Sequence, residues 1–524
     1  GGSSLATNSP PFSDHIRDDV KAMVAEAHPV SSYMEYNQGR VRNILGGCFD
    51  DYDYNNDPAY KVGTGADCRV ASKPYLHNAF VNIRPNTNAS NAIERVFGAG
   101  EGFSGDRDGD KSQDHSYVLI DIPEGIDNFA DTEIFGAGAY NGLGMRYKAE
   151  DTFNGTVEPS EISAVIDLMR GRVSAAYGGS YEEGITRRTL VNVPEKSTIK
   201  INNIFGGAYG MHILPPCDVY EANVNYLGGD ARVNGAIYGG NNNVRRTLYS
   251  KVNVSAPVLK ENGYSGTIYG AGRGQYTWSE YTEVNLNKGA NACEVYGGGE
   301  LGNVLNAESV QKYLQLYSGQ PADMVANEDP DTWGNPDRWV GGTVGGTLKD
   351  DYKKIWKKEW MSAWTIDGYY NPVGEFTRYV GNQYTNLTNP LARKAEMDDR
   401  DYSKLTDDQK ARTYQRYNTN VLIHEGATVG NYAYGGGYGS ESIPLSGGVH
   451  GSTNIALLGG TVGKDIYAAD TTGSVCDIFG AGSPNENSTG FTASANAYIQ
   501  GGTARNVYGG GWRGGVGYHE GLKA

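Results

Sequence analysis

Short segments in which apolar and polar residues alternate recur along most of the chain. Examples are Val81-Asn82-Ile83, Leu190-Val191-Asn192-Val193, Val252-Asn253-Val254 and Val284-Asn285-Leu286. Alternation with a period of two in β-branched residues predicts β-strands with one buried face. A second, shorter apolar stretch follows each such segment, so each repeat predicts two strands joined by turns.

The second stretch carries a recurrent phrase: a β-branched or small residue, an aromatic residue, then glycine. Clear copies are Val96-Phe97-Gly98, Ile134-Phe135-Gly136, Ile204-Phe205-Gly206, Ile237-Tyr238-Gly239, Ile268-Tyr269-Gly270, Val295-Tyr296-Gly297, Ala433-Tyr434-Gly435, Ile478-Phe479-Gly480 and Val507-Tyr508-Gly509. With the weaker copy Ala176-Tyr177-Gly178 included, the aromatic positions from Phe97 to Tyr296 lie 27 to 42 residues apart. Unequal spacing suits a coil whose strands are fixed and whose loops vary in length. The sequence therefore predicts an all-β fold, a parallel β-helix or β-solenoid, with coils stacked about 4.8 Å apart.

The phrase also predicts which side chains face the core. The residue before the aromatic is apolar and should point inward, whereas residues two positions apart in a strand share a face. Arg95 and Glu133 precede an aromatic by two positions, which favours an outer position for the rings. Glycines that bulge the strand would instead turn the rings inward. A stacked, buried ladder and an exposed ladder both remain open at this point.

The pattern divides the chain into four parts. Residues 1–40 predict an N-terminal helical cap, with Ser13 capping a helix over about 14–27. Residues 41–302 and 421–524 are the two blocks of the solenoid. Residues 303–420 break the pattern and predict one large, partly helical insertion. In it, Trp356, Trp360 and Trp364 lie at i, i+4 and i+8 on one predicted helix face.

The composition of the chain disfavours some classes of binding partner. The formal net charge is 45 − 61 = −16, and the chain has no long basic block, which disfavours nucleic acid and anionic membrane surfaces. No apolar run approaches 18 residues, so no transmembrane helix is predicted. The acidic sequence, with 74 glycines and 38 tyrosines, is typical of an extracellular or cell-surface protein. Because it begins at Gly1, we interpret it as a processed protein or a fragment.

Two acidic loops are candidate calcium sites. Oxygen-bearing side chains alternate at Asp51, Asp53, Asn55 and Asp57, and again at Asp106, Asp108 and Asp110. Such spacing begins many calcium loops, although Val62 stands where an EF-hand would need its closing carboxylate. The predicted calcium would be structural, and the alternative is a pair of solvated loops. The eight histidines show no paired spacing that would predict a zinc site.

The glycine phrases at 237–240, 295–299 and 507–511, with Gly-Gly-Thr turns at 459–461 and 501–503, resemble glycine-rich β-helical repeats of bacterial surface proteins. Such repeats are common in adhesin-like proteins. The resemblance covers about 41–302 and 420–515. It implies a β-helical fold and a bacterial surface location, and it implies no catalytic residues because the repeat is a folding motif.

Two functions follow as expectations. The first is non-catalytic: adhesion, binding of a glycan or surface protein partner, or service as an accessory subunit of a surface assembly. Aromatic candidates for binding are Tyr434, Tyr438 and Trp512, together with Trp356, Trp360 and Trp364, for which packing onto the solenoid is the alternative.

The second function is a polysaccharide-degrading β-helix enzyme, either a lyase or a glycoside hydrolase. Its candidate residues are the carboxylates Asp121, Glu133 and Glu294 with Arg95 or Arg273. The chain has no GxSxG motif, so a serine nucleophile of that class is not indicated.

Overall fold

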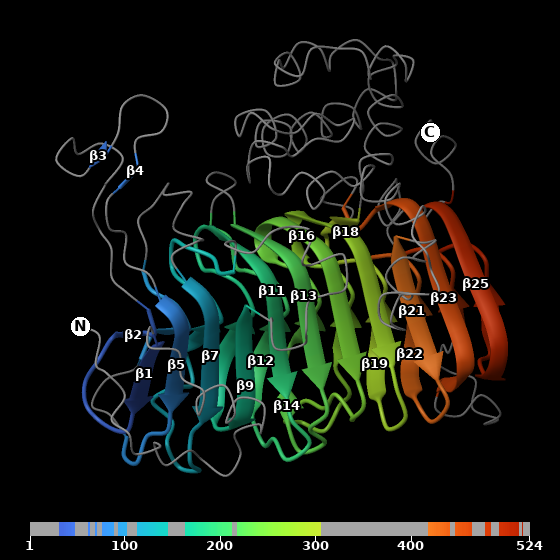
Figure 1. Ribbon diagram of the computed structural model, residues 1–524. Coiled ribbons are helices and arrows are strands. Elements are labelled where there is room, and N and C mark those ends of the chain that lie inside the picture. Colours follow the sequence, from blue (N-terminus) through green and yellow to red (C-terminus); the bar gives the residue numbers. More distant parts are fainter. Residues whose placement is uncertain are drawn as a thin grey trace, which may run out of the picture.

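The protein is a parallel β-solenoid (Figure 1). The computed structural model describes residues 31–47, 61–62, 69–70, 76–88, 93–101, 113–144, 163–211, 217–304, 418–440, 446–463, 477–483, 492–512 and 516. Within these ranges the chain is all-β and contains no helix. Twenty-four strands join one parallel network, as the alternating pattern predicts. Residues 1–30 of the predicted N-terminal cap and the predicted helices of the insertion lie outside the described residues.

Each coil contributes to two stacks, which we call the long strands and the short strands. The long strands are β1 (Ser31–Tyr36), β5 (Leu76–Ile83), β7 (Gln113–Asp121), β9 (Ala164–Arg170), β11 (Gly184–Val193), β13 (Cys217–Tyr226), β16 (Asn242–Val254), β18 (Arg273–Leu286), β20 (Asn303–Val304), β21 (Thr419–His424), β23 (Val449–Val462) and β25 (Thr492–Thr503). The short strands are β2 (Asn43–Leu45), β6 (Arg95–Phe97), β8 (Glu133–Phe135), β10 (Arg172–Tyr177), β12 (Lys200–Phe205), β14 (Arg232–Val233), β15 (Ala236–Tyr238), β17 (Thr267–Tyr269), β19 (Asn291–Tyr296), β22 (Thr428–Tyr434), β24 (Asp477–Phe479) and β26 (Asn506–Tyr508). One coil divides its long strand into β20 and β21, and another divides its short strand into β14 and β15. A separate antiparallel pair joins β3 (Lys61–Val62) and β4 (Arg69–Val70).

The core lies between the stack of long strands and the stack of short strands. Val224, Val252 and Val284 occupy one register row of the long strands, and Ile237 and Ile268 occupy a row of the short strands. All five are fully buried in one continuous apolar cluster. Burying such a side chain stabilises a fold by about 1.5–3 kcal/mol. Every coil repeats this contribution, so β-branched residues at these positions favour the coil throughout.

A row of small side chains fixes the spacing between the two stacks. Thr282 and Thr419 are register partners in this row, which elsewhere holds Ala, Ser or Thr. Their hydroxyls donate to the carbonyl oxygens of Gly297 and Gly435 over 2.6 Å. The same bond joins Thr189 to the Gly206 carbonyl. These hydroxyls satisfy buried carbonyls where the glycine phrase turns the chain, which an apolar side chain would leave unpaired.

The polar residues of the alternating segments form an amide ladder on the opposite face of the long strands. Nδ2 of Asn253 donates to Oδ1 of Asn225 over 2.9 Å, and Nδ2 of Asn285 donates to Oδ1 of Asn253 over 3.0 Å. Parallel in-register stacking places identical side chains one coil apart, which lets each amide both donate and accept. In the Val-Asn-Val pattern, the valines therefore pack in the core and the asparagine joins the amide ladder on the other face of the strand.

One long strand is divided between two distant parts of the sequence. Ser279 of β18 pairs with Val304 of β20, while Thr282 of the same strand pairs with Thr419 of β21. Backbone bonds hold both ends, from Val304 N to Gly448 O and from Thr282 N to Asn418 O, each 2.8 Å long. Residues 304 and 419 therefore meet the same neighbouring strand three register positions apart, and the coil is complete on both sides of the predicted insertion.

Candidate functional site

The aromatic residues of the glycine phrase form a continuous stack along the short strands. This aromatic ladder consists of Phe97, Phe135, Tyr177, Phe205, Tyr238, Tyr269, Tyr296, Tyr434, Phe479 and Tyr508. Neighbouring ring centroids lie 4.6 to 5.1 Å apart, with interplanar angles of 5 to 19°. The spacing follows from the separation of parallel strands. Rings stacked in this way contribute about 0.5–1.5 kcal/mol per pair beyond their burial.

The ladder faces away from the apolar core. Ile268 belongs to the core cluster, whereas the next residue, Tyr269, belongs to a separate cluster made of the ladder rings and their neighbours. Adjacent residues in a strand point to opposite faces, so the glycines do not swing the rings inward. The rings are nevertheless buried: from Phe97 to Phe479 each is 8% exposed or less. The ladder is thus outside the core and still covered.

A second row of residues covers the ladder. Its members follow a ladder residue by four positions; we call them the covering row: Tyr181, Tyr209, Asn242, Arg273, Glu300, Tyr438, Ser483 and Trp512. From Tyr181 to Ser483 their backbone N–H groups donate in succession to carbonyls of the preceding coil, over 2.8 to 3.1 Å. This second backbone ladder keeps the row in register along the solenoid. Repeated side chains are therefore presented at a fixed spacing.

Aromatic members of the covering row pack edge-on against the ladder. The Tyr209 ring lies 5.4 Å from that of Tyr177 at 89°, and the Tyr438 ring lies 6.1 Å from that of Tyr296 at 79°. Trp512 contacts Phe479 in the same manner, 5.7 Å away at 70°. These three covering rings are half-buried, so part of each ring remains at the surface.

The middle of the covering row is polar. Glu300 accepts a hydrogen bond from the Tyr238 hydroxyl and lies 3.4 Å from Nε of Arg273. One coil away from Tyr269, Glu294 accepts a hydrogen bond of 3.0 Å from the Tyr296 hydroxyl. The Arg273 side chain is 47% exposed and that of Glu300 27%. Two carboxylates and one guanidinium therefore stand beside the central tyrosines.

Burial alters the acidity of the ladder tyrosines. It raises the pKa of Tyr177, Tyr238, Tyr269, Tyr296 and Tyr434 well above the ordinary value near 10, because an apolar environment disfavours the phenolate. For Tyr238 and Tyr269 the negative charge of Glu300 raises the pKa further. These hydroxyls therefore stay protonated at neutral pH and can act as hydrogen-bond donors.

Of the predicted binding residues, three belong to this face. Tyr434 is a ladder ring and only 2% exposed. Tyr438 and Trp512, which belong to the covering row, are half-buried and so have ring surface that a ligand can reach. Trp356, Trp360 and Trp364 lie outside the described residues. So do both predicted calcium loops, Asp51, Asp53, Asn55 and Asp57 as well as Asp106, Asp108 and Asp110, and calcium binding there stays a prediction.

The carboxylates considered for catalysis do not come together. Glu133 and Glu294 share a register row but lie five coil steps apart, about 24 Å at a spacing of about 4.8 Å. Glu133 pairs with Nε of Arg95 at 3.2 Å. Asp121 is fully buried at the end of β7, where it pairs with Arg170 and lies 3.7 Å from Arg84. Each carboxylate thus has its own partner in a different part of the fold.

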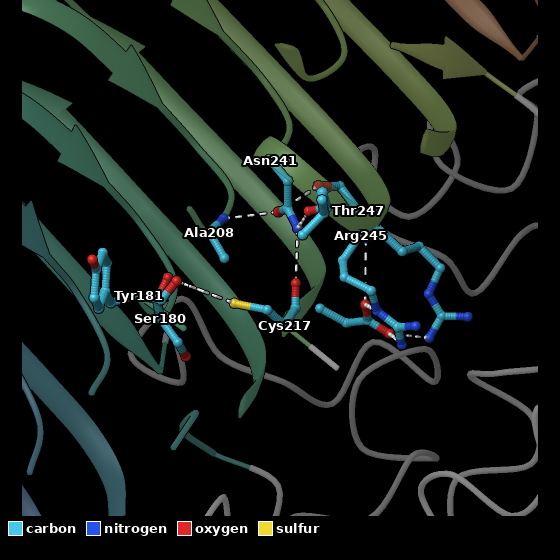
Figure 2. Close-up of polar contacts among 10 residues, drawn as sticks. Ser180, Tyr181, Ala208, Cys217, Asn241, Arg245 and Thr247 are labelled. Atoms are coloured by element: carbon cyan, nitrogen blue, oxygen red, sulfur yellow. Dashed lines mark hydrogen bonds and ion pairs between the residues drawn. The ribbon is translucent and has the colours of Figure 1, made fainter. Parts of the chain in front are cut away.

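A second polar cluster lies at the start of the long strands (Figure 2). The Asn241 amide accepts from Ala208 N and donates to Cys217 O, both over 2.8 Å, and accepts from the Thr247 hydroxyl over 3.0 Å. Next to it, Arg245 and Arg246 both pair with the fully buried Asp218, at 3.1 and 3.0 Å.

The contacts of Asn241 with Ala208 and Cys217 and those of Asp218 with the two arginines join neighbouring coils, and the Thr247 bond lies within one coil. These contacts satisfy buried polar groups, so the role of the cluster is structural. Cys217, a free and fully buried thiol, has its pKa raised by that burial, which leaves the unreactive thiol form.

Tyr181, Tyr209 and Glu300 were missed as site residues. The signal that would have found them is their constant offset of four residues after each ladder aromatic, which becomes meaningful only when the ladder is known to face outward.

Comparisons with known proteins add no relative: no family model, curated protein or solved structure matches the chain. Among the described ranges, no group of three or more His, Cys, Asp or Glu side chains is arranged to hold a metal ion. Over those same residues, no helix is long and apolar enough to cross a membrane.

Proposed function

We propose that the protein is a non-catalytic binding scaffold that recognises carbohydrate through the covering row. The observation that carries this proposal is the series of half-buried rings, Tyr181, Tyr209, Tyr438 and Trp512, held at fixed spacing on a rigid stack. Tyrosine and tryptophan combine a broad apolar face with a polar group, which suits a sugar ring that has an apolar face and hydroxyl edges. Rigid presentation lowers the entropic cost of binding.

The location of this activity is part of the proposal. The acidic, glycine- and tyrosine-rich composition and the adhesin-like repeats support a secreted or surface-attached protein of a bacterium. Such a protein would adhere to glycans or bind a surface partner as an accessory subunit of a larger assembly. Glu133, Glu294 and Asp121 are separated, so they do not form the pair of carboxylates at about 5–10 Å that glycoside hydrolysis needs. Glu294 and Glu300 lie on the same face, and the assay for reducing ends tests whether they cleave.

The proposal is tested by incubating the full chain with a glycan array and, in parallel, measuring the release of reducing ends from the glycans that bind. We expect binding without product. Tyr438→Ala should weaken binding about tenfold, because it removes a ring contact of about 1.4 kcal/mol.

Tyr264→Ala is the matched control for this test, because Tyr264 is 74% exposed on a turn and belongs to neither row. Release of reducing ends would replace the proposal with an enzymatic function. Absence of binding to every glycan would reject carbohydrate recognition.

A further inference from the structure

The face formed by the covering row and by Tyr432, which precedes the ladder residue Tyr434 by two positions, has two aromatic platforms separated by a polar centre. The first platform consists of Tyr181 and Tyr209, whose rings stack 5.4 Å apart at 29°. The second consists of Tyr432, Tyr438 and Trp512, with Tyr432 and Trp512 meeting edge-on at 5.2 Å. All five rings are half-buried. A ligand that uses both platforms must cross the coils between them.

The distance between the platforms follows from the backbone ladder. Four successive bonds, from Asn242 N to Ala208 O through to Tyr438 N to Gly299 O, lead from the Tyr209 coil to the Tyr438 coil. Four coil steps of about 4.8 Å correspond to about 19 Å along the solenoid axis. A monosaccharide or disaccharide is too short to span this distance, so simultaneous contact requires an extended chain.

The charged groups of the polar centre determine whether a charged or an uncharged ligand is favoured. Glu294 and Glu300 supply two carboxylates, and the single guanidinium, Arg273, is already within 3.4 Å of Glu300. Carboxylates accept hydrogen bonds from hydroxyl groups but repel anions. The whole chain also carries a net charge of −16, which slows the approach of an acidic polymer. This centre favours a hydroxyl-rich, uncharged ligand.

We propose that the covering row binds a neutral polysaccharide that runs parallel to the solenoid axis and contacts both platforms at once. This inference rests on the proposed carbohydrate recognition and specifies its ligand. The Arg95 guanidinium lies 4.2 Å from the centre of the Tyr181 ring, and Tyr209 stacks on that ring at 5.4 Å. Sugar rings therefore pack against the exposed parts of Tyr181 and Tyr209 at one end and of Tyr438 and Trp512 at the other. Their hydroxyls donate to Glu300 and Glu294 between the platforms. Two linked contacts raise the affinity for long chains because the second contact is intramolecular.

The test is calorimetric titration of the full chain with neutral gluco-, xylo- and manno-oligosaccharides, from dimers to octamers, and with oligogalacturonates of the same lengths. We expect weak binding of dimers and a steep gain in affinity once the oligosaccharide spans both platforms. Tyr209→Ala and Tyr438→Ala should each lower octamer affinity about tenfold and flatten the length dependence. Tyr209→Phe keeps the ring and should bind as the parent does, and Tyr264→Ala serves as the remote control.

The outcomes separate the two proposals. Neutral glycans bound with an affinity independent of length, or a preference for oligogalacturonates, would overturn this inference and leave carbohydrate recognition standing. No binding by any oligosaccharide would remove both, and a protein partner would then be the occupant. Near-ultraviolet circular dichroism of each variant reports whether the ring stack is intact, so a folding defect cannot pass for lost binding.

Discussion

At the scale of single residues, the glycine after each ladder aromatic is required by the approach of neighbouring coils. A Cβ atom built on Gly297 would lie 2.3 Å from the carbonyl oxygen of Gly435 and 3.1 Å from Cβ of Thr419. The clash is with backbone, which cannot move without separating the coils. We therefore expect Gly297→Ala to lower the free energy of unfolding by about 1–3 kcal/mol, the usual cost of overpacking, measured from the midpoint of urea unfolding.

The chain offers a matched control for this substitution. Gly509 holds the same position in the last described copy of the phrase, yet a Cβ there would meet nothing within 4 Å. Gly509→Ala should therefore leave the midpoint nearly unchanged. Equal effects of the two substitutions would show that glycine is needed for local backbone freedom rather than for the approach of the next coil.

For single residues, the direction of a side chain could be predicted from the sequence, but its exposure could not. The inward position of Ile268 follows from alternation alone, because strand geometry fixes which neighbours share a face. The burial of Tyr269 does not follow, because it depends on Arg273, Glu300 and other residues of the covering row that come from later turns. Sequence patterns encode the direction of a side chain, whereas its exposure is decided by what packs over it.

At the scale of elements, the alternating segments and glycine phrases predict both strand stacks because each repeat encodes its own pair of strands. The predicted cap and insertion helices stay predictions, since they lie outside the described residues. What the sequence could not reveal is the division of one long strand between β20 and β21. The alternating pattern predicts the strand from Val421 onward, but the two residues of β20 are too few to show any pattern. Nothing in the sequence shows that Val304 and Thr419, 115 positions apart, extend the same strand beside β18.

This division predicts that residues 305–418 can be replaced by the dipeptide Gly-Asn, in which Asn takes the place of Asn418, without loss of the solenoid. Val304 and Thr419 pair with Ser279 and Thr282, so two residues complete the register opposite Glu280 and Tyr281. The shortened chain should unfold cooperatively in urea with the β-sheet circular dichroism of the parent. The binding face, which lies on the short strands, should keep its affinity for glycans.

A control deletion tests whether the junction itself matters. Replacing residues 303–420 by a six-residue Gly/Ser link fills the positions opposite Trp278 to Glu283 but removes Val304, which is fully buried, and the hydroxyl of Thr419 that donates to Gly435 O. This variant should unfold at a lower urea concentration than the shorter deletion. If both deletions abolish cooperative unfolding, the paired ends of β20 and β21 are insufficient to hold the coil together.

At the scale of the whole molecule, the solenoid behaves as a linear stack in which each coil contacts only its neighbours. Its two described ends differ. Ile44 in the first short strand is 4% exposed, whereas Val507, at the equivalent position in the last, is 43% exposed. The interior of the stack is uniform by comparison, and the aromatic ladder runs through it without interruption. A perturbation that acts on the ladder should therefore act on many coils together.

Alkaline pH is such a perturbation. Burial, reinforced by nearby carboxylates such as Glu294 and Glu300, raises the folded-state pKa of five ladder tyrosines above the value near 10 of an unfolded chain. A raised pKa means that the folded state holds its protons more tightly. The resulting stability is fully present below pH 10 and is lost as the pH rises above it, when unfolding releases the protons.

When the intact chain is titrated with base, exposed tyrosines should ionise first without loss of the β-sheet circular dichroism. The remaining tyrosinate absorbance should appear together with the loss of that signal, because burial of the stacked ladder disfavours its phenolates. Substituting Tyr269 by Phe removes one of these protons and keeps the ring, so the transition should become less steep and move to higher pH. In urea the same chain should titrate near pH 10 without cooperativity. If the absorbance of the folded chain rose to completion while its circular dichroism stayed constant, the ladder hydroxyls would be open to water, and the covering row would not exclude solvent as its contacts indicate.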